Sequence, residues 1–125
     1  MSGPSAAARY AALTSSLVTS RPSSTTRSVT DLVVQVAQEA SIAQVNEAFQ
    51  AAAEGPLKGY LHYTADPIVS SDIVGTPWSC TFDSLLTMAH GDQVKIIGWY
   101  DNEWGYSNRL ADLAVLVGAS LPARS

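Results

Sequence analysis

Hydrophobic and polar residues recur with two different periods along this chain, and the change of period separates helices from strands. Between positions 41 and 55 the apolar residues fall on one helical face: Ile42, Val45, Phe49 and Ala52. Ser41 and Gln44 have the spacing of a capping box, in which each side chain bonds a backbone N–H at the helix start. Gly55-Pro56 follows, and proline cannot continue a helix. The pattern predicts a helix over residues 42–54.

Three stretches carry the β-branched and aromatic residues that favour strands. Residues 28–36 combine a period of two with a central apolar run, which predicts a strand covered in part on both faces. Residues 93–99 follow the turn sequence His90-Gly91-Asp92 and predict a second strand. Residues 58–64 alternate between residue types and predict a third.

The segments between these elements are less regular. Residues 68–75 predict a connecting loop with strand-like ends. Residues 79–88 predict a strand that runs into a turn or a short helix, and the period alone leaves both open. Because a turn precedes residues 94–99, residues 79–87 and 94–99 are candidates for a hairpin.

A second helical period occupies residues 104–118. Its apolar stripe consists of Leu110, Leu113, Ala114 and Val117. Asp101 and Glu103 lie at the helix start, where their negative charges interact favourably with the positive end of the helix dipole. Hairpin-joined strands with two helices predict an α+β fold, a partial and mostly antiparallel sheet with helices packed on one side.

Charge is distributed unevenly along the chain. Residues 1–30 carry three arginines and no acid, which gives +3, and residues 31–125 carry four bases and 11 acids, which gives −7. The acidic part has no basic stripe for nucleic acid and no basic amphipathic helix for a membrane surface. The chain also has no run of 18 apolar residues. We therefore expect neither a nucleic-acid nor a membrane partner.

Residues 1–27 form a separate compositional region. Serine, threonine and arginine dominate it and acid is absent, so we expect a disordered tail. The same composition is similar to an organelle transit peptide. A solvated tail, an artefact of the assigned reading frame and a targeting signal all remain open as interpretations.

Three motifs together resemble one known family. They are Ser-Val-Thr-Asp-Leu-Val-Val-Gln-Val at 28–36, Ala-Ala-Glu-Gly-Pro-Leu-Lys-Gly-Tyr at 52–60 and Trp-Tyr-Asp-Asn-Glu-Trp-Gly-Tyr-Ser at 99–107. In this order they resemble the C-terminal part of the catalytic domain of glyceraldehyde-3-phosphate dehydrogenase. The resemblance covers about residues 28–121 and leaves 1–27 unmatched. So abrupt a boundary suggests a truncated or frame-shifted gene product, or a fusion.

The resemblance carries functional expectations. Enzymes of this family oxidise an aldehyde through a cysteine thiohemiacetal, transfer a hydride to NAD and release the acyl group to phosphate. They are usually cytoplasmic homotetramers that act on a triose phosphate. By resemblance, Asn102 holds the nicotinamide amide and Tyr106 lies beside the ring. We expect NAD as cofactor, with a homo-oligomer or a full-length relative as partner. The residues that select NAD over NADP lie in the unmatched half of the family.

Other family features have no match in this sequence. It contains no glycine-rich G-x-G-x-x-G turn. Cys80 does not match the family nucleophile and is interpreted as a small buried apolar residue. Neither His62 nor His90 matches the family base, and His62 is expected to be structural or solvent-facing. We therefore expect a part of the enzyme that is inactive alone, with a non-catalytic interaction or oligomerisation module as the alternative.

Overall fold

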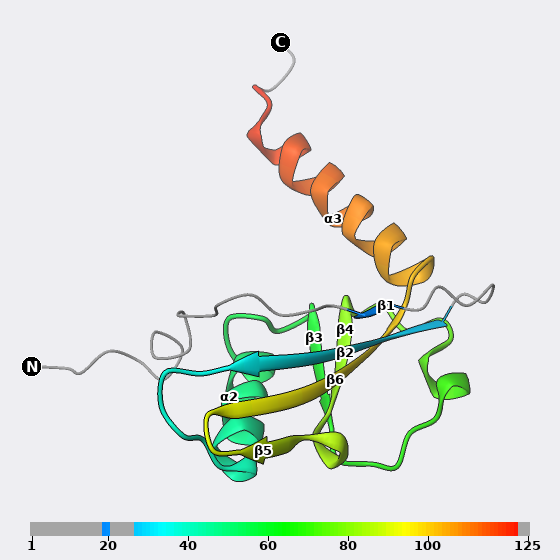
Figure 1. Cartoon of the computed structure of the whole chain (residues 1–125). Helices are drawn as coiled ribbons and strands as arrows, with labels where there is room; N and C mark the ends of the chain where they lie inside the picture. The colour runs from blue at the N-terminus through cyan, green and yellow to red at the C-terminus, as the bar shows by residue number, and fades with distance from the viewer. Residues whose placement is uncertain (1–18, 21–26, 123–125) are drawn as a thin grey trace, which may run out of the picture.

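The computed structural model describes residues 19–20 and 27–122, which fold around one mixed β-sheet. The strands are β1 (Thr19–Ser20), β2 (Arg27–Gln35), β3 (Leu61–Thr64), β4 (Cys80–Asp83), β5 (Met88–His90) and β6 (Gln93–Asp101). Their order in the sheet is β1-β2-β6-β4-β3, and β5 pairs with one end of β6 (Figure 1). Among the described strands, only β3 and β4 pair in parallel. The predicted α+β class with a mostly antiparallel sheet is confirmed.

The long pair β2–β6 is the axis of the fold. It runs in unbroken antiparallel register from Arg27 opposite Asp101 to Gln35 opposite Gln93. Both predicted strands are confirmed, and the second extends two residues past Trp99. The extension matters because Asp101, its last residue, then lies at the base of the final helix.

Helix α2 (Ile42–Glu54) packs on one face of the sheet and has the bounds that its sequence predicts. The capping box is present: the Gln44 N–H donates to Ser41 Oγ at 3.2 Å, and the Ser41 N–H donates to Gln44 Oε1 at 2.9 Å. Val45 is buried against the sheet, and Phe49 stacks on Phe82 of β4 with ring centroids 4.0 Å apart. The core thus joins α2 to the middle of the sheet.

The predicted third strand is shorter than its pattern indicates. Residues 58–60 belong to turns that follow α2, and β3 begins only at Leu61. The N–H groups of Tyr60 and Leu61 both donate to the Leu57 carbonyl, and Gly59 has a φ of +87°. These local turns use the backbone groups that a strand would offer to a neighbour.

The residues between β3 and β6 resolve the alternatives that the sequence leaves open. A 3₁₀ turn, η1 (Ser70–Ile73), interrupts the predicted loop, and it buries Ile73. Strand β4 runs into a second 3₁₀ turn, η2 (Ser84–Leu86). Residues 79–87 do reach β6 through β4, but the hairpin across Gly91 is formed by β5 and β6.

Helix α3 (Trp104–Ser120) forms where predicted but differs in its packing. It extends away from the sheet instead of lying on the side that carries α2 (Figure 1). Its apolar stripe stays exposed, and of its residues only Gly105 is buried. A helical period shows that a helix has an apolar face, but it does not say what covers that face.

The expectations for the N-terminal tail fall mostly outside the described residues. Thr19 and Ser20 pair with Asp31 and Thr30 of β2, and Arg27 begins β2. The described helices are too short or too polar to cross a lipid bilayer.

Candidate functional site

The candidate site is the turn that joins β6 to α3. Asp101 ends the strand, Asn102 and Glu103 form the turn, and Trp104 begins the helix. A turn between a long strand and a long helix holds its side chains on two rigid elements. This is where the sequence predicts the functional residues.

Asn102 and Tyr106, the two predicted cofactor contacts, both reach solvent here. Asn102 is exposed in the turn, and Tyr106, on the first turn of α3, is 64% exposed. The side-chain amide of Asn102 can donate and accept, as the carboxamide of nicotinamide can. Both side chains are therefore open to solvent around the start of α3.

Asp101, directly before Asn102, is a buried carboxylate, with 4% of its surface exposed. Its Oδ1 accepts N–H groups from Glu103 at 3.0 Å and Trp104 at 2.9 Å, and its Oδ2 accepts the Gly75 N–H at 2.9 Å. Burial alone raises its pKa. The bonds from Trp104, Gly75 and Glu103, with the charge of Arg27, outweigh burial and hold the pKa below its ordinary value.

Two further contacts fix the start of α3 against the body. A Cβ added at Gly105 would lie 2.7 Å from the Trp78 carbonyl oxygen, so only glycine allows this approach. Arg109 lies over the Tyr60 ring, with its guanidinium carbon 4.6 Å from the centroid, and donates to Ser79 Oγ at 3.1 Å. The first two turns of α3 are therefore tied to the residues that precede β3 and β4.

Cys80 lies on β4, away from this turn. Its Sγ would be 2.6 Å from a Cβ added at Gly98 on the neighbouring β6, so it fills the space that this glycine leaves. Burial raises the pKa of the Cys80 thiol to about 11. A thiol with so high a pKa carries almost no thiolate at neutral pH.

The two histidines lie at separate places on the surface. His62 is exposed on β3 and stacks on Trp78 with ring centroids 5.4 Å apart. His90 is exposed at the end of β5. Among the described residues there is no cluster of three or more His, Cys, Asp or Glu side chains suited to a metal ion.

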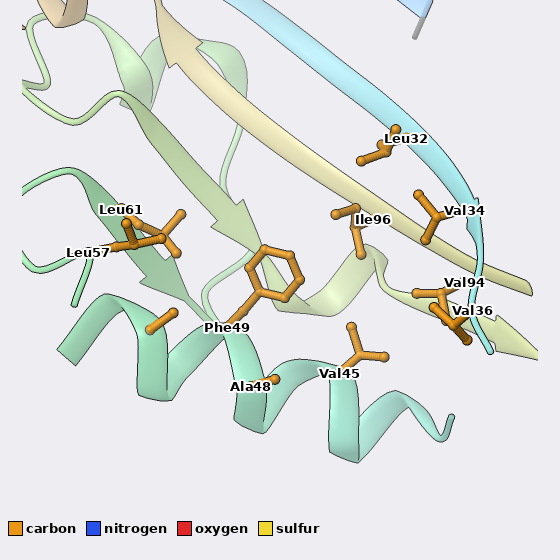
Figure 2. A pocket seen from close by; sticks show the side chains of 11 residues that line it. Leu32, Val34, Val36, Val45, Ala48, Phe49, Leu57, Leu61, Val94 and Ile96 are labelled. Carbon is orange, nitrogen blue, oxygen red and sulfur yellow. The ribbon is translucent and has the colours of Figure 1, made fainter. Parts of the chain in front are cut away.

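Two hollows lie on the face of the sheet that carries α2. One, of about 300 Å³, lies between α2 and the strands β2 and β6, and Figure 2 shows Val45, Ala48 and Phe49 directed at it from the helix. The other, of about 280 Å³, continues past Phe49 toward Cys80 and Tyr100. Neither hollow has Asn102 or Tyr106 in its lining.

Comparison with known proteins assigns the chain to a family. Residues 14–102 match the family model described as glyceraldehyde 3-phosphate dehydrogenase, C-terminal domain. The chain belongs to the glyceraldehyde-3-phosphate dehydrogenase family. This confirms the resemblance to the C-terminal part of that enzyme. The match includes the first two motifs and the third as far as Asn102, and it begins at residue 14, within the segment that the three motifs leave unmatched.

Individual relatives support the same assignment. The chain is 67% identical over 97 residues to glyceraldehyde-3-phosphate dehydrogenase 2 of Streptomyces avermitilis, which covers 77% of this chain and 29% of the relative. It is 63% identical over 98 residues to glyceraldehyde-3-phosphate dehydrogenase of Streptomyces coelicolor, a match that covers 77% of this chain and 29% of the relative. It is 62% identical over 96 residues to glyceraldehyde-3-phosphate dehydrogenase of Mycobacterium tuberculosis (strain H37Rv), a match that covers 77% of this chain and 28% of the relative. The chain spans less than a third of the length of these curated relatives.

Some residues of the site escape sequence reasoning. Asp101 is visible in the sequence as an acid near a helix start, but its bond to Gly75 joins residues 26 positions apart. The contact of Arg109 with Tyr60 likewise joins residues far apart in the sequence, one before β3 and one in α3. The only sequence signal for the Gly75 partner is the turn chemistry of Gly75-Thr76-Pro77, which marks a turn without saying what it bonds.

Proposed function

We propose that residues 28–121 form the C-terminal part of a glyceraldehyde-3-phosphate dehydrogenase catalytic domain and supply one wall of its nicotinamide site. Asn102 orients the carboxamide, and Tyr106 lies beside the ring. The observation that carries the proposal is the exposure of Asn102 on the β6–α3 turn and of Tyr106 on the first turn of α3, within the motif at 99–107 that resembles the family. When bound, the NAD nicotinamide supplies a hydride acceptor.

The contribution of Asn102 is orientation. An amide that both donates and accepts favours one rotation of the carboxamide, and so determines which face of the ring meets the substrate. Fixing that geometry before reaction lowers the barrier, because less freedom remains to be lost. The remaining walls, and the groups that bind the triose phosphate, belong to other parts of the enzyme, which works in the cytoplasm as the family does.

The chain by itself is proposed to be inactive. Thioester chemistry needs a thiolate with a base or a positive neighbour in hydrogen-bond reach. Cys80 is instead held as a thiol by burial, beside Gly98. His62 is stacked on Trp78 and makes no match to the family base.

A chimera tests the proposal. Residues 28–121 replace the matching part of the Streptomyces avermitilis relative, whose 67% identity makes the exchange practicable. We expect the chimera to oxidise glyceraldehyde 3-phosphate with NAD, and Asn102→Ala to lower kcat/KM for NAD about tenfold or more through lost hydrogen bonds. Steady-state kinetics measure both.

The control is Asn108→Ala, which removes the same type of side chain from the second turn of α3, where it donates to the Trp104 carbonyl. Equal effects of the two substitutions would refute a specific role for Asn102. Turnover by the 125-residue chain alone, abolished by Cys80→Ser, would refute its inactivity.

Exposed apolar residues in the second half of α3 favour a second candidate, an oligomerisation module. Val115 is 73% exposed and Leu116 is 68% exposed, on a helix with no charged residue after Asp112. Large exposed apolar patches commonly mark interaction sites. We expect the chain to sediment as a dimer or larger species and Leu116→Glu to shift it toward monomer, with Lys58→Glu as an exposed control. A wild-type monomer across micromolar concentrations would exclude this candidate.

A further inference from the structure

Asp101 has surroundings that a helix cap alone does not explain. It ends β6, yet α3 begins at Trp104, and Glu103, the residue before the helix, makes no side-chain cap bond. Asp101 does the capping from two residues further back, through its bonds to the N–H groups of Glu103 and Trp104. Its Oδ1 therefore closes a ring around Asn102.

The second carboxylate oxygen reaches a different segment. Oδ2 accepts the N–H of Gly75, in the loop after η1, at 2.9 Å. Gly75 has a φ of +73°, a conformation that residues with a Cβ rarely adopt, and a Cβ there would meet no atom within 4 Å. The carboxylate thus ties the Asn102 turn to the Gly75 loop across one buried group.

This carboxylate is held mainly by backbone donors. The ion pairs found among the described residues join Lys95 to Asp31 and Arg109 to Asp112, and neither involves Asp101. Arg27, directly opposite in the β2–β6 register, contributes its charge without a close pair. An ionised acceptor of several N–H groups forms stronger bonds than a neutral one.

We infer that Asp101 is a positioning residue for Asn102: its ionised carboxylate, shared between the Gly75 loop and the first N–H groups of α3, sets the direction in which Asn102 presents its amide. The functional meaning of that direction rests on the proposed nicotinamide contact. The hydrogen bonds from Gly75, Glu103 and Trp104 to Asp101 do not rest on that contact. Asp101 touches no cofactor and acts only through the turn.

The test uses the full chain labelled with ¹⁵N, and it compares amide hydrogen exchange in the turn with that of the buried Phe82 amide. In Asp101→Ala we expect exchange at Glu103 and Trp104 to accelerate about ten- to a hundredfold relative to Phe82, as for lost hydrogen bonds to a charged group. Asp101→Asn keeps one side-chain oxygen and should restore protection in part. Equal acceleration at all three amides would show a general loss of stability and overturn the inference.

Asp83→Asn is the matched control. Asp83 is also buried at a strand end, where it accepts the Leu85 N–H at 3.2 Å and Trp99 Nε1–H at 3.1 Å. Its replacement should destabilise the chain without selectively exposing Glu103 and Trp104. Selective acceleration at those two amides in Asp83→Asn would also overturn the inference.

A pH profile separates positioning from mere stability. Because the pKa of Asp101 is lowered in the folded chain from 3.8, its stabilising effect is complete above that value and is lost as the pH falls through the folded pKa. The Asn102 side-chain resonances should follow this titration in the wild type and lose it in Asp101→Asn. Arg27→Gln removes a favourable charge and should shift the midpoint upward. If the chemical shifts of the Asn102 side chain did not change as Asp101 titrates, the positioning role would be refuted.

The two claims fail separately. If Asn102→Ala leaves the NAD kinetics of the chimera unchanged while exchange at Glu103 and Trp104 responds to Asp101→Ala, the proposed function is wrong and the positioning role of Asp101 stands. If the kinetics respond but the exchange does not, the nicotinamide contact stands and the positioning role of Asp101 is wrong.

Discussion

Replacing Phe82 by alanine is expected to lower the free energy of unfolding by about 3–5 kcal/mol, the usual cost of emptying a buried phenylalanine site. Phe82 is only 2% exposed and stands at the centre of β4. Phe49 of α2 stacks on it, and the ring centroid of Tyr63 on β3 lies 5.8 Å from that of Phe82. Its removal therefore loosens both the helix and the parallel strand pair. Urea denaturation followed by fluorescence measures the loss.

Phe49→Ala is the control, because it removes the same side chain from the other member of the stack. Phe49 is only half-buried and borders both hollows, so its loss should cost less, about 2–3 kcal/mol. A loss for Phe82→Ala no larger than that for Phe49→Ala would contradict the central place of β4 in the core.

The size of this effect bears on whether the chain is stable alone. Domains unfold with about 5–15 kcal/mol, so one core residue here accounts for a large share. The buried apolar cluster that contains Phe82 is small: among the described residues it consists of Val45, Phe82 and Val94, with half-buried neighbours around them. The two hollows beside Phe49 mark where the sheet face lacks further covering atoms. Phe82 therefore has few substitutes.

Elements governed by local chemistry could be predicted from the sequence. The Ser41–Gln44 box acts within one turn, and so the start of α2 was set correctly. The strands β2 and β6 carry apolar residues over nine positions each, long enough for propensity to decide.

Elements governed by distant partners could not. The alternation at 58–64 looked like a strand, but turns closed on Leu57 took its first residues. The α3 stripe predicted a buried face, yet burial depends on what lies opposite, which no period encodes. The parallel pairing of β3 with β4 likewise needs a crossover that a local pattern does not show.

The candidate site divides in the same way. Asn102 and Tyr106 followed from a motif, and the fold places both in solvent at one turn. Asp101 was visible only as a charge near a helix start. Its bond to Gly75 depends on the loop after η1 folding back to the end of β6, a contact set by the whole sheet. A sequence motif predicts Asn102 and Tyr106 as nicotinamide contacts, and only the fold points to Asp101 as the proposed positioning residue for Asn102.

Replacing Gly105 by alanine is expected to destabilise the chain by about 1–3 kcal/mol, as overpacking does. The added Cβ would lie 2.7 Å from the Trp78 carbonyl oxygen, and a backbone atom cannot rotate away as a side chain can. The first turn of α3 must therefore move away from the body. Because Asp101 bonds the Trp104 N–H, that movement pulls on the turn that carries Asn102. Urea denaturation measures the stability, and NAD kinetics of the chimera measure the displacement.

Gly118→Ala is the matched control within the same helix. No atom lies within 4 Å of a Cβ added there, so the substitution should be neutral or should stabilise the chain by up to about 1 kcal/mol through helix propensity. Opposite signs at the two glycines would show that α3 is packed against the body at its first turns and not at Gly118. If Gly105→Ala were as harmless as Gly118→Ala, the helix start would not be fixed by Trp78, and the support of the Asn102 turn would rest on the contacts of Asp101 and Arg109.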